Sequence, residues 1–125
     1  MVNAAMDIQA INRVQLPFPP ALASAVTHFY GELLGLTLMP QPPGPVLRFA
    51  ARGQRVDLVA TEQPAAAAPG LTPLSFEVQG LPQLRKRLLD AAFPLEENQP
   101  LPGYLRFFVH DPAGNRLEFV EPDVS

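Results

Sequence analysis

The chain carries one pattern of strand residues twice, and this repetition constrains its fold more than any other feature. The copies align as Leu47-Arg48-Phe49 with Leu105-Arg106-Phe107 and as Arg55-Val56-Asp57-Leu58-Val59 with Arg116-Leu117-Glu118-Phe119-Val120. An acid therefore occupies the same strand position in both copies. Because alternating patterns are common in β-sheets, two hairpins can also look alike by chance. A shared order of helices and strands around the copies separates duplication from chance.

The first half predicts a strand, a helix and three strands. Residues 8–16 alternate as a strand does, and Pro17 should end that strand. Apolar residues then recur at helical spacing from Pro20, and Gly35 suits the end of a helix: Leu22, Val26, Phe29 and Leu33. We expect short strands at 36–39, 46–51 and 54–61, the last two joined by a tight turn at Arg52-Gly53.

The second half predicts the same order. Residues 74–78 alternate, a helix opens at Pro82, and strands are expected near 94–95, over 104–110 and over 115–121. The basic residues Arg85, Lys86 and Arg87 are expected to form a solvated face of that helix. The predicted fold is α+β, with module one over about 7–61, a linker over 62–72 and module two over about 73–122, in one domain spanning 1–125.

Composition narrows the class of protein. A chain of 125 residues with 47% apolar content can build one core. The net charge of -3, without a dense basic stretch, argues against nucleic acid as a partner. No apolar run approaches the roughly 20 residues that span a bilayer, so no membrane partner is expected. The absence of cysteine agrees with a cytoplasmic location.

Two segments resemble the vicinal oxygen chelate superfamily, which includes glyoxalase I, bleomycin-resistance proteins, fosfomycin-resistance enzymes and extradiol dioxygenases. They are Phe29-Tyr30-Gly31-Glu32-Leu33-Leu34-Gly35-Leu36, similar to the first helix, and Asp111-Pro112-Ala113-Gly114-Asn115-Arg116-Leu117-Glu118, similar to the final hairpin. The resemblance spans nearly the whole chain. It implies two βαβββ modules whose mixed sheets curl into cups, with helices on the outer face. It also implies a small-molecule site that usually holds a divalent metal, and a homodimer.

The resemblance places metal ligands on the first and fourth strands of each module. In this chain those positions are Arg13, Asp57, Pro73 and Glu118. A guanidinium offers only donors and repels a cation, and proline has no side-chain donor atom. We therefore predict no cofactor and no metal, and a divalent metal would require a different alignment. We expect Arg13 to form an ion pair with Glu118, with Asp57 nearby.

Alternation of side chains predicts which residues face the cup. It places Arg48, Tyr104, Arg106 and Phe108 on that face. Together with Arg13, which the resemblance places in the cup, these four residues are expected to bind a ligand. Such a cup suits a small, partly planar anion, although Arg48 and Arg106 can equally lie at solvated rims. His28 is expected on the helix surface. His110 is expected to make a structural hydrogen bond, with contact to a ligand as the alternative.

Three classes of function remain open. The first, which we favour, is a small-molecule binding protein that sequesters its ligand without metal or chemistry. The second is a lyase or dioxygenase-type enzyme, either metal-dependent or with Glu118 or Asp57 as catalytic base and Arg13 stabilising an oxyanion. The third is an interaction module whose cup is filled by side chains.

Overall fold

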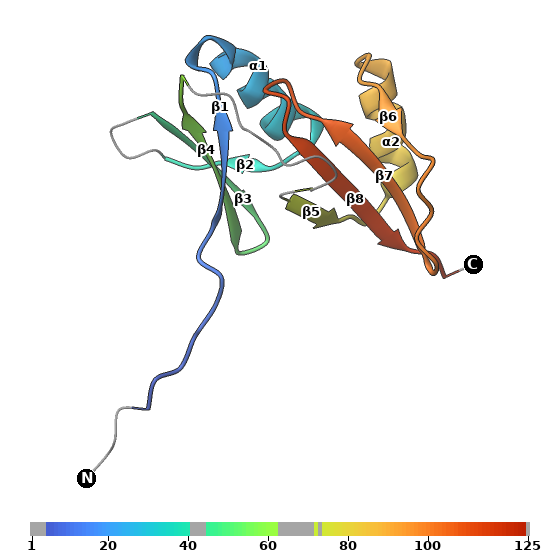
Figure 1. Ribbon diagram of the computed structural model, residues 1–125, viewed down its shortest axis with the longest axis horizontal. Helices are drawn as coiled ribbons and strands as arrows, with labels where there is room; N and C mark the ends of the chain where they lie inside the picture. Colours follow the sequence, from blue (N-terminus) through green and yellow to red (C-terminus); the bar gives the residue numbers. More distant parts are fainter. Residues whose placement is uncertain (1–4, 41–44, 63–71, 73, 125) are drawn as a thin grey trace.

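Module one contains four strands and a continuous helical segment. The computed structural model describes residues 5–40, 45–62, 72 and 74–124. The elements of module one are β1 (Val14–Phe18), η1 (Pro20–Leu22), α1 (Ala23–Thr27), η2 (His28–Leu33), β2 (Thr37–Leu38), β3 (Val46–Ala51) and β4 (Gln54–Ala60) (Figure 1). The helical segment passes from a 3-10 turn through an α-helix to a π-helix. It ends at Gly35, whose φ of 74° is costly for other residues.

Module two repeats this order. Its elements are β5 (Leu74–Glu77), α2 (Leu81–Asp90), β6 (Leu95–Glu96), β7 (Tyr104–His110) and β8 (Arg116–Pro122). The sheets have the orders β1-β4-β3-β2 and β5-β8-β7-β6, in which the first pair is parallel and the others are antiparallel. The α+β fold of two βαβββ modules is therefore confirmed. The expected linker lies almost entirely outside the described residues.

The register of the hairpins corrects the alignment of the two copies. Arg48 pairs with Asp57 across β3 and β4, whereas Phe108 pairs with Glu118 across β7 and β8. Phe108, not Arg106, is therefore the structural counterpart of Arg48. The segment between the paired residues is only one residue longer in the second hairpin than in the first, whereas the alignment assumed three extra residues. The expected tight turn in the first hairpin is confirmed, with positive φ at both Arg52 and Gly53.

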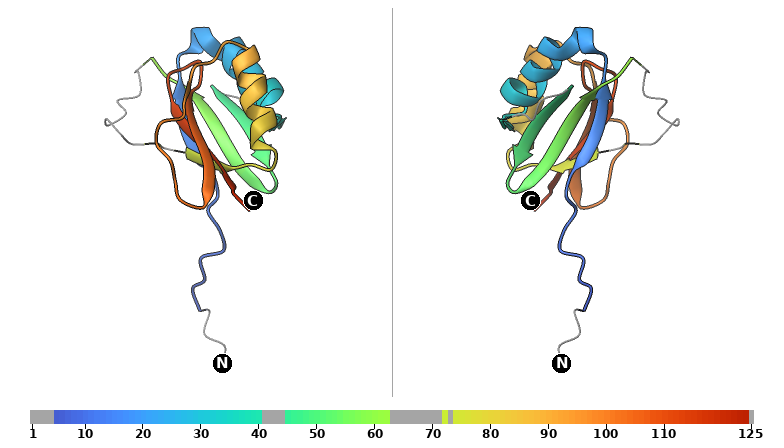
Figure 2. Two further views of the ribbon diagram at one scale, coloured as in Figure 1. Left: turned by 90° about the vertical axis from the view of Figure 1, so that its right-hand side faces the viewer. Right: turned by 90° about the vertical axis from the view of Figure 1, so that its left-hand side faces the viewer.

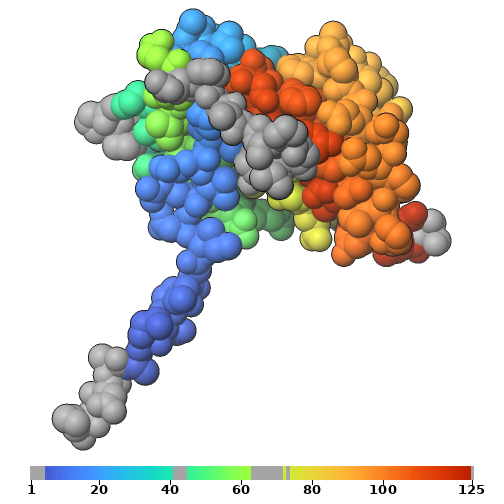
Figure 3. Space-filling view, viewed as in Figure 1, coloured from blue at the N-terminus to red at the C-terminus, as the bar shows by residue number. Residues whose placement is uncertain are grey.

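Strand β1 starts later than expected and continues through Pro17. Val14 pairs with Val56, only two residues after β4 begins, so the described residues 5–11 have no strand to pair with. In the space-filling view this N-terminal segment stands clear of the folded body (Figure 3). The prediction of a strand over residues 8–16 that ends at Pro17 is therefore wrong. Proline is tolerated in β1 because this is an edge strand.

The two modules share one hydrophobic core. Buried side chains from both helices and both sheets form a single cluster, in which the Phe29 and Phe93 ring centroids are 5.1 Å apart. The helical segments of the two modules lie close together in both side views (Figure 2). Polar contacts also cross the boundary, because Asn115 Nδ2 donates to Pro17 O at 2.9 Å. Within the described ranges, no helix has the length and apolar character needed to span a bilayer.

Candidate functional site

Three arginines surround one buried carboxylate on the first sheet, in a group that we call the Asp57 cluster: Asp57, Arg13, Arg48 and Arg55. The Asp57 oxygens lie 3.5 Å from Arg13 Nε, 3.2 Å from Arg48 Nε and 3.4 Å from Arg55 Nε. The Asp57 side chain is 2% exposed, whereas the arginine side chains are 22% to 41% exposed. Three positive charges against one negative charge give the cluster a formal charge of +2.

Local strand geometry assembles this cluster. Asp57 lies in the middle of β4, paired with Arg48 on β3 and with Gln15 on β1. Asn12, just before β1, accepts hydrogen bonds at its Oδ1 from Arg13 Nη1 at 2.9 Å and from Arg55 Nη2 at 3.3 Å. Arg55 Nε is buried but has no hydrogen-bond partner, because its approach to Asp57 lacks the necessary geometry. The cluster is therefore rich in donors and poor in acceptors.

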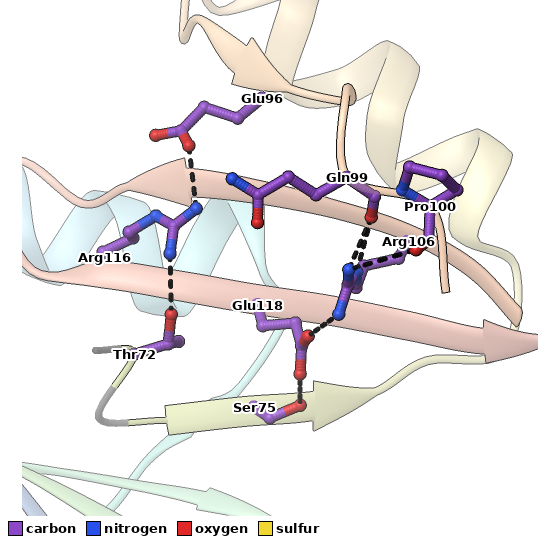
Figure 4. A network of polar contacts seen from close by, with 8 residues as sticks. All are labelled: Thr72, Ser75, Glu96, Gln99, Pro100, Arg106, Arg116 and Glu118. Carbon is purple, nitrogen blue, oxygen red and sulfur yellow. Dashed lines mark hydrogen bonds and ion pairs between the residues drawn. The ribbon is translucent and has the colours of Figure 1, made fainter. Parts of the chain in front are cut away.

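The equivalent acid of module two forms a second group, the Glu118 cluster: Ser75, Arg106 and Glu118. Ser75 Oγ donates to Glu118 Oε1 at 2.5 Å, and Arg106 Nη1 donates to Glu118 Oε2 at 3.1 Å (Figure 4). Ser75 reaches Glu118 because β5 pairs with β8 and sets the two residues side by side. Each carboxylate oxygen of Glu118 therefore already accepts one hydrogen bond.

Arg106 also anchors the loop between β6 and β7. Its Nε and Nη2 donate to Gln99 O at 3.0 and 2.5 Å, and Nη2 lies 3.5 Å from Pro100 O. Figure 4 shows the guanidinium between this loop and Glu118. Most donors of Arg106 are thus used within the protein. A direct bond from Arg106 to a ligand stays a prediction, but its loop contacts are evident.

Phe108 lies beneath two guanidinium groups. Arg116 Cζ is 3.8 Å and Arg106 Cζ is 5.0 Å from the centre of its ring, and Phe108 is 5% exposed. Arg116 is held in place by Glu96 Oε2 at 2.9 Å and Thr72 Oγ1 at 3.2 Å. A ligand near Phe108 would therefore meet these arginines before the ring. Tyr104 lies at the far end of β7, opposite Pro122, and is 43% exposed.

The expected ion pair between Arg13 and Glu118 is wrong for the folded chain. Arg13 contacts Asp57, and Glu118 contacts Arg106. Alternation of side chains assigned the acids and arginines to the correct faces of their strands, but it did not predict which of them form ion pairs. Each acid pairs with an arginine of its own module. His110 Nδ1 lies 3.7 Å from Glu96 Oε1 and its side chain is 54% exposed, so it forms a surface contact. His28 is exposed on the helical segment, and Pro73 lies outside the described residues.

The donors at the family ligand positions do not fit a divalent metal. Asp57 is occupied by guanidinium groups, and Glu118 accepts from Arg106 and Ser75. Over residues 5–40, 45–62, 72 and 74–124, no three histidine or acidic side chains gather in a way that could hold a metal ion. A cation at Asp57 would have to displace fixed positive charge. The chemistry of these residues favours an anion.

Three residues in or beside these clusters were not chosen from the sequence: Arg55 and Ser75, which belong to them, and Arg116, which lies over Phe108. Alternation had already placed Arg55 on the face of Asp57, and Arg116 on the face of Glu118, so the signal was present for both. Ser75 could be found only by knowing which strand lies beside β8. Of the expected ligand-binding residues, the structure brings Arg13 and Arg48 together at Asp57, and brings Arg106 beside Phe108 at Glu118.

Solved structures share this architecture over nearly the whole chain. A protein from Bacillus anthracis assigned to the glyoxalase family is 25% identical, with a TM-score of 0.83, over 95% of this chain and 99% of that chain. FosX, a fosfomycin resistance protein from Listeria monocytogenes, is 10% identical, with a TM-score of 0.78, over 94% of each chain. The antibiotic-binding protein TnmS3 from Streptomyces sp. is 22% identical, with a TM-score of 0.70, over 93% of this chain and 100% of that chain.

No protein-family model matches the sequence, and no curated protein matches it. The fold, with its paired βαβββ modules, and the likeness to these structures place the chain in the vicinal oxygen chelate superfamily. In its two sheets, the acids Asp57 and Glu118 each form ion pairs with arginines.

Proposed function

We propose that the protein binds a small organic anion without a metal. The observation that carries this proposal is the excess of guanidinium groups at Asp57, where three arginines share one carboxylate. Arg48 and Arg55 are partly exposed, so their unused N–H groups can meet a carboxylate or phosphate in solution. The antibiotic-binding function named for TnmS3 supports a binding role for this fold. The lack of cysteine supports a cytoplasmic location.

We further propose that the complete site forms between two copies of the chain. The contacts of the Asp57 cluster lie on sheet one and the residues just before it, and those of the Glu118 cluster lie on sheet two and its loops. Among the described residues, no hydrogen bond or ion pair joins one cluster to the other. A two-fold homodimer would let the Asp57 cluster of one chain face the Glu118 cluster of its partner.

A ligand screen tests the binding proposal. Purified protein is first subjected to elemental analysis, and its melting temperature is then measured with benzoate, salicylate, phthalate and phosphate. The best anion is titrated by calorimetry into the wild type, Arg48→Gln and Arg85→Gln. We expect Arg48→Gln to weaken binding about tenfold, because a charge-assisted hydrogen bond is lost. Arg85 pairs with Glu97 on the exposed side of α2 and serves as the matched control.

Two results would contradict this function. One is a tightly held divalent ion in stoichiometric amount, which would favour a metal-dependent lyase or dioxygenase-type enzyme. The other is the absence of any thermal shift with all four anions at about 10 mM, well above the dissociation constant of a useful site. Melting of Arg48→Gln without ligand is measured as well, so that a general loss of stability is not mistaken for a loss of binding.

Mixed dimers test the composite site. Arg48→Gln and Glu118→Gln chains carrying different affinity tags are produced together, and the heterodimer is purified through both tags. If each site combines two chains, the heterodimer holds one site with both substitutions and one intact site. The heterodimer should then bind half as many ligand molecules as the wild-type dimer, with wild-type affinity. If each site lies within one chain, both sites of the heterodimer carry a substitution, and no binding with wild-type affinity should be measured.

A second candidate function is metal-independent proton transfer with Glu118 as the base. It is favoured by the 18% exposure of the Glu118 side chain, against 2% for Asp57. The anion selected by the screen is incubated with the protein in deuterated water, and exchange of its carbon-bound protons is followed by NMR. Exchange that disappears in Glu118→Gln while binding persists would support catalysis. Binding without exchange supports sequestration.

A further inference from the structure

A cleft of about 670 Å³ separates part of module one from part of module two. One wall comes from Leu34–Thr37 and the β3–β4 turn, and the other from the end of β5 and the start of α2. Figure 1 shows the turn of this hairpin beside β5. Phe76 and Phe119 line the cleft, whereas their neighbours Ser75 and Glu118 belong to the opposite face of the same strands. The cleft is therefore distinct from the Glu118 cluster.

Part of the cleft lining is apolar. Leu36, Phe76, Leu84 and Phe119 contribute to it, and the rings of Phe76 and Phe119 stack with centroids 5.2 Å apart. Phe119 and Leu84 belong to the buried core, but Leu36 and Phe76 are only partly buried. A concave apolar surface with a few polar groups at its edge is the usual form of a small-molecule site.

One cation at the cleft differs from its neighbours on α2. Arg85 pairs with Glu97 and Lys86 pairs with Asp90, so both are neutralised on the exposed side of the helix. Arg87 instead reaches module one, where its Nη1 donates to Leu33 O at 3.1 Å. Within the part of the chain that the structure describes, no acidic side chain forms an ion pair with Arg87. All three residues are exposed, as expected for a solvated face, and Arg87 alone also donates to module one.

The charges at the cleft favour an anion. Arg52 and Arg87 contribute two positive charges, and Glu77 contributes one negative charge. The bond to Leu33 O uses one donor of Arg87 and holds its guanidinium at the module boundary. Its remaining N–H groups suit a carboxylate, which guanidinium binds in a planar, two-point geometry.

We propose that this cleft is a second ligand site, which takes an amphipathic monocarboxylate. The apolar body lies against Leu36, Phe76 and Leu84, and the carboxylate pairs with Arg87. The site is independent of the anion site at Asp57 and does not rest on that function. Occupancy would bridge the two modules, since the ligand contacts both walls.

Octanoate and its neutral analogue octanamide probe this site in the full chain. Each is titrated into ¹⁵N-labelled protein, and dissociation constants are taken from amide shifts. We expect octanoate to shift the amides of 34–37 and 77–83 and to bind about tenfold more tightly than octanamide, because the amide cannot form the ion pair. Arg87→Gln should reduce octanoate affinity to the level of octanamide.

Two further variants keep the test decisive. Ala51 lines the cleft, so Ala51→Phe should block both ligands even if Arg87→Gln alters folding. Arg85→Gln, on the same helix but outside the cleft, should bind octanoate as the wild type does. The proposal is overturned if octanoate and octanamide bind equally or not at all. It is also overturned if Arg48→Gln abolishes octanoate binding while Arg87→Gln leaves it intact, because the ligand would then occupy the Asp57 site.

Discussion

Tyr30 and Asp111 join the two modules through a buried hydrogen bond of 2.5 Å from Tyr30 Oη to Asp111 Oδ2. The carboxylate is the organising centre of the β7–β8 turn, because it also accepts from the backbone N–H groups of Ala113 and Asn115 and from Asn115 Nδ2. The helical segment of module one is therefore bonded directly to the turn of module two. The turn that identified the family also has a structural function.

Tyr30→Phe should lower the free energy of unfolding by about 1–3 kcal/mol, the usual cost of losing a hydrogen bond to a charged group. The ring itself would still fill the core, so the native fold should persist. Urea denaturation measures the change, with Tyr104→Phe as the matched control because Tyr104 is 43% exposed. Equal stability of the Tyr30→Phe variant and the wild type would show that the bond contributes nothing.

The same tyrosine should make the protein sensitive to alkaline pH. Burial raises the pKa of Tyr30 well above its usual value of about 10, and the Asp111 carboxylate and their hydrogen bond raise it further. The folded state therefore holds this proton more tightly than the unfolded state does. Its stabilising contribution is fully present below pH of about 10 and is lost as pH rises toward the folded-state pKa.

Denaturation at several pH values from neutral to alkaline checks this expectation. Stability should fall by up to about 1.4 kcal/mol for each pH unit above the unfolded-state pKa, from this residue alone. Tyr30→Phe should show a shallower decline than the wild type. Parallel declines in the two proteins would assign the alkaline sensitivity to other groups.

Removing the charge of Asp57 should destabilise the fold. Asp57→Asn leaves three guanidinium groups close together with no anion between them. Loss of one partner from a buried ion pair is costly, but the arginines are partly exposed and water screens their repulsion. We expect a loss of about 1–3 kcal/mol by urea denaturation. Asp90→Asn, which affects an exposed pair with Lys86, is the control; a similar loss there would refute a special role for Asp57.

Glu121 should stabilise α2 from a distance in the sequence. Its carboxylate oxygens accept from Gly80 N at 2.5 Å and Leu81 N at 3.3 Å, where the helix begins without a side-chain cap of its own. Glu121→Ala should therefore cost about 1 kcal/mol, the value of a typical N-terminal cap. Thermal denaturation measures it, and Glu32→Ala, at an exposed helical position, provides the comparison. No difference between the two variants would exclude capping.

Arg106→Gln should loosen the loop between β6 and β7. The substitution removes the bonds to Gln99 O and Pro100 O as well as the ion pair with Glu118. Amide hydrogen exchange of residues 97–103 should become faster, because the loop can open without first breaking these contacts. Ser75→Ala perturbs Glu118 without touching the loop, so its exchange in this segment should match the wild type. Faster exchange in both variants would mean that Glu118, not Arg106, orders the loop.

Periodicity in the sequence was sufficient to predict the order of helices and strands, because each element buries one regular face. It did not predict where β1 begins, since the start depends on where β4 offers a partner. It also led to the wrong prediction of which arginine pairs with Glu118. Alternation tells on which face of a strand a side chain lies, but it does not tell which side chains from other strands lie next to it. The bond between Tyr30 and Asp111 joins residues 81 positions apart, and no local pattern signals it.

Pro17 also limits how a second chain can associate with β1. The neighbouring carbonyl of Phe18 accepts from Thr61 N beside β4, so alternation turns the backbone of Pro17 toward the free edge. Proline has no N–H there, and its carbonyl is already taken by Asn115 Nδ2. An incoming strand would find neither a donor nor an open acceptor at this point. The outer edge of β1 is thereby closed to continuous strand addition, a common safeguard against aggregation.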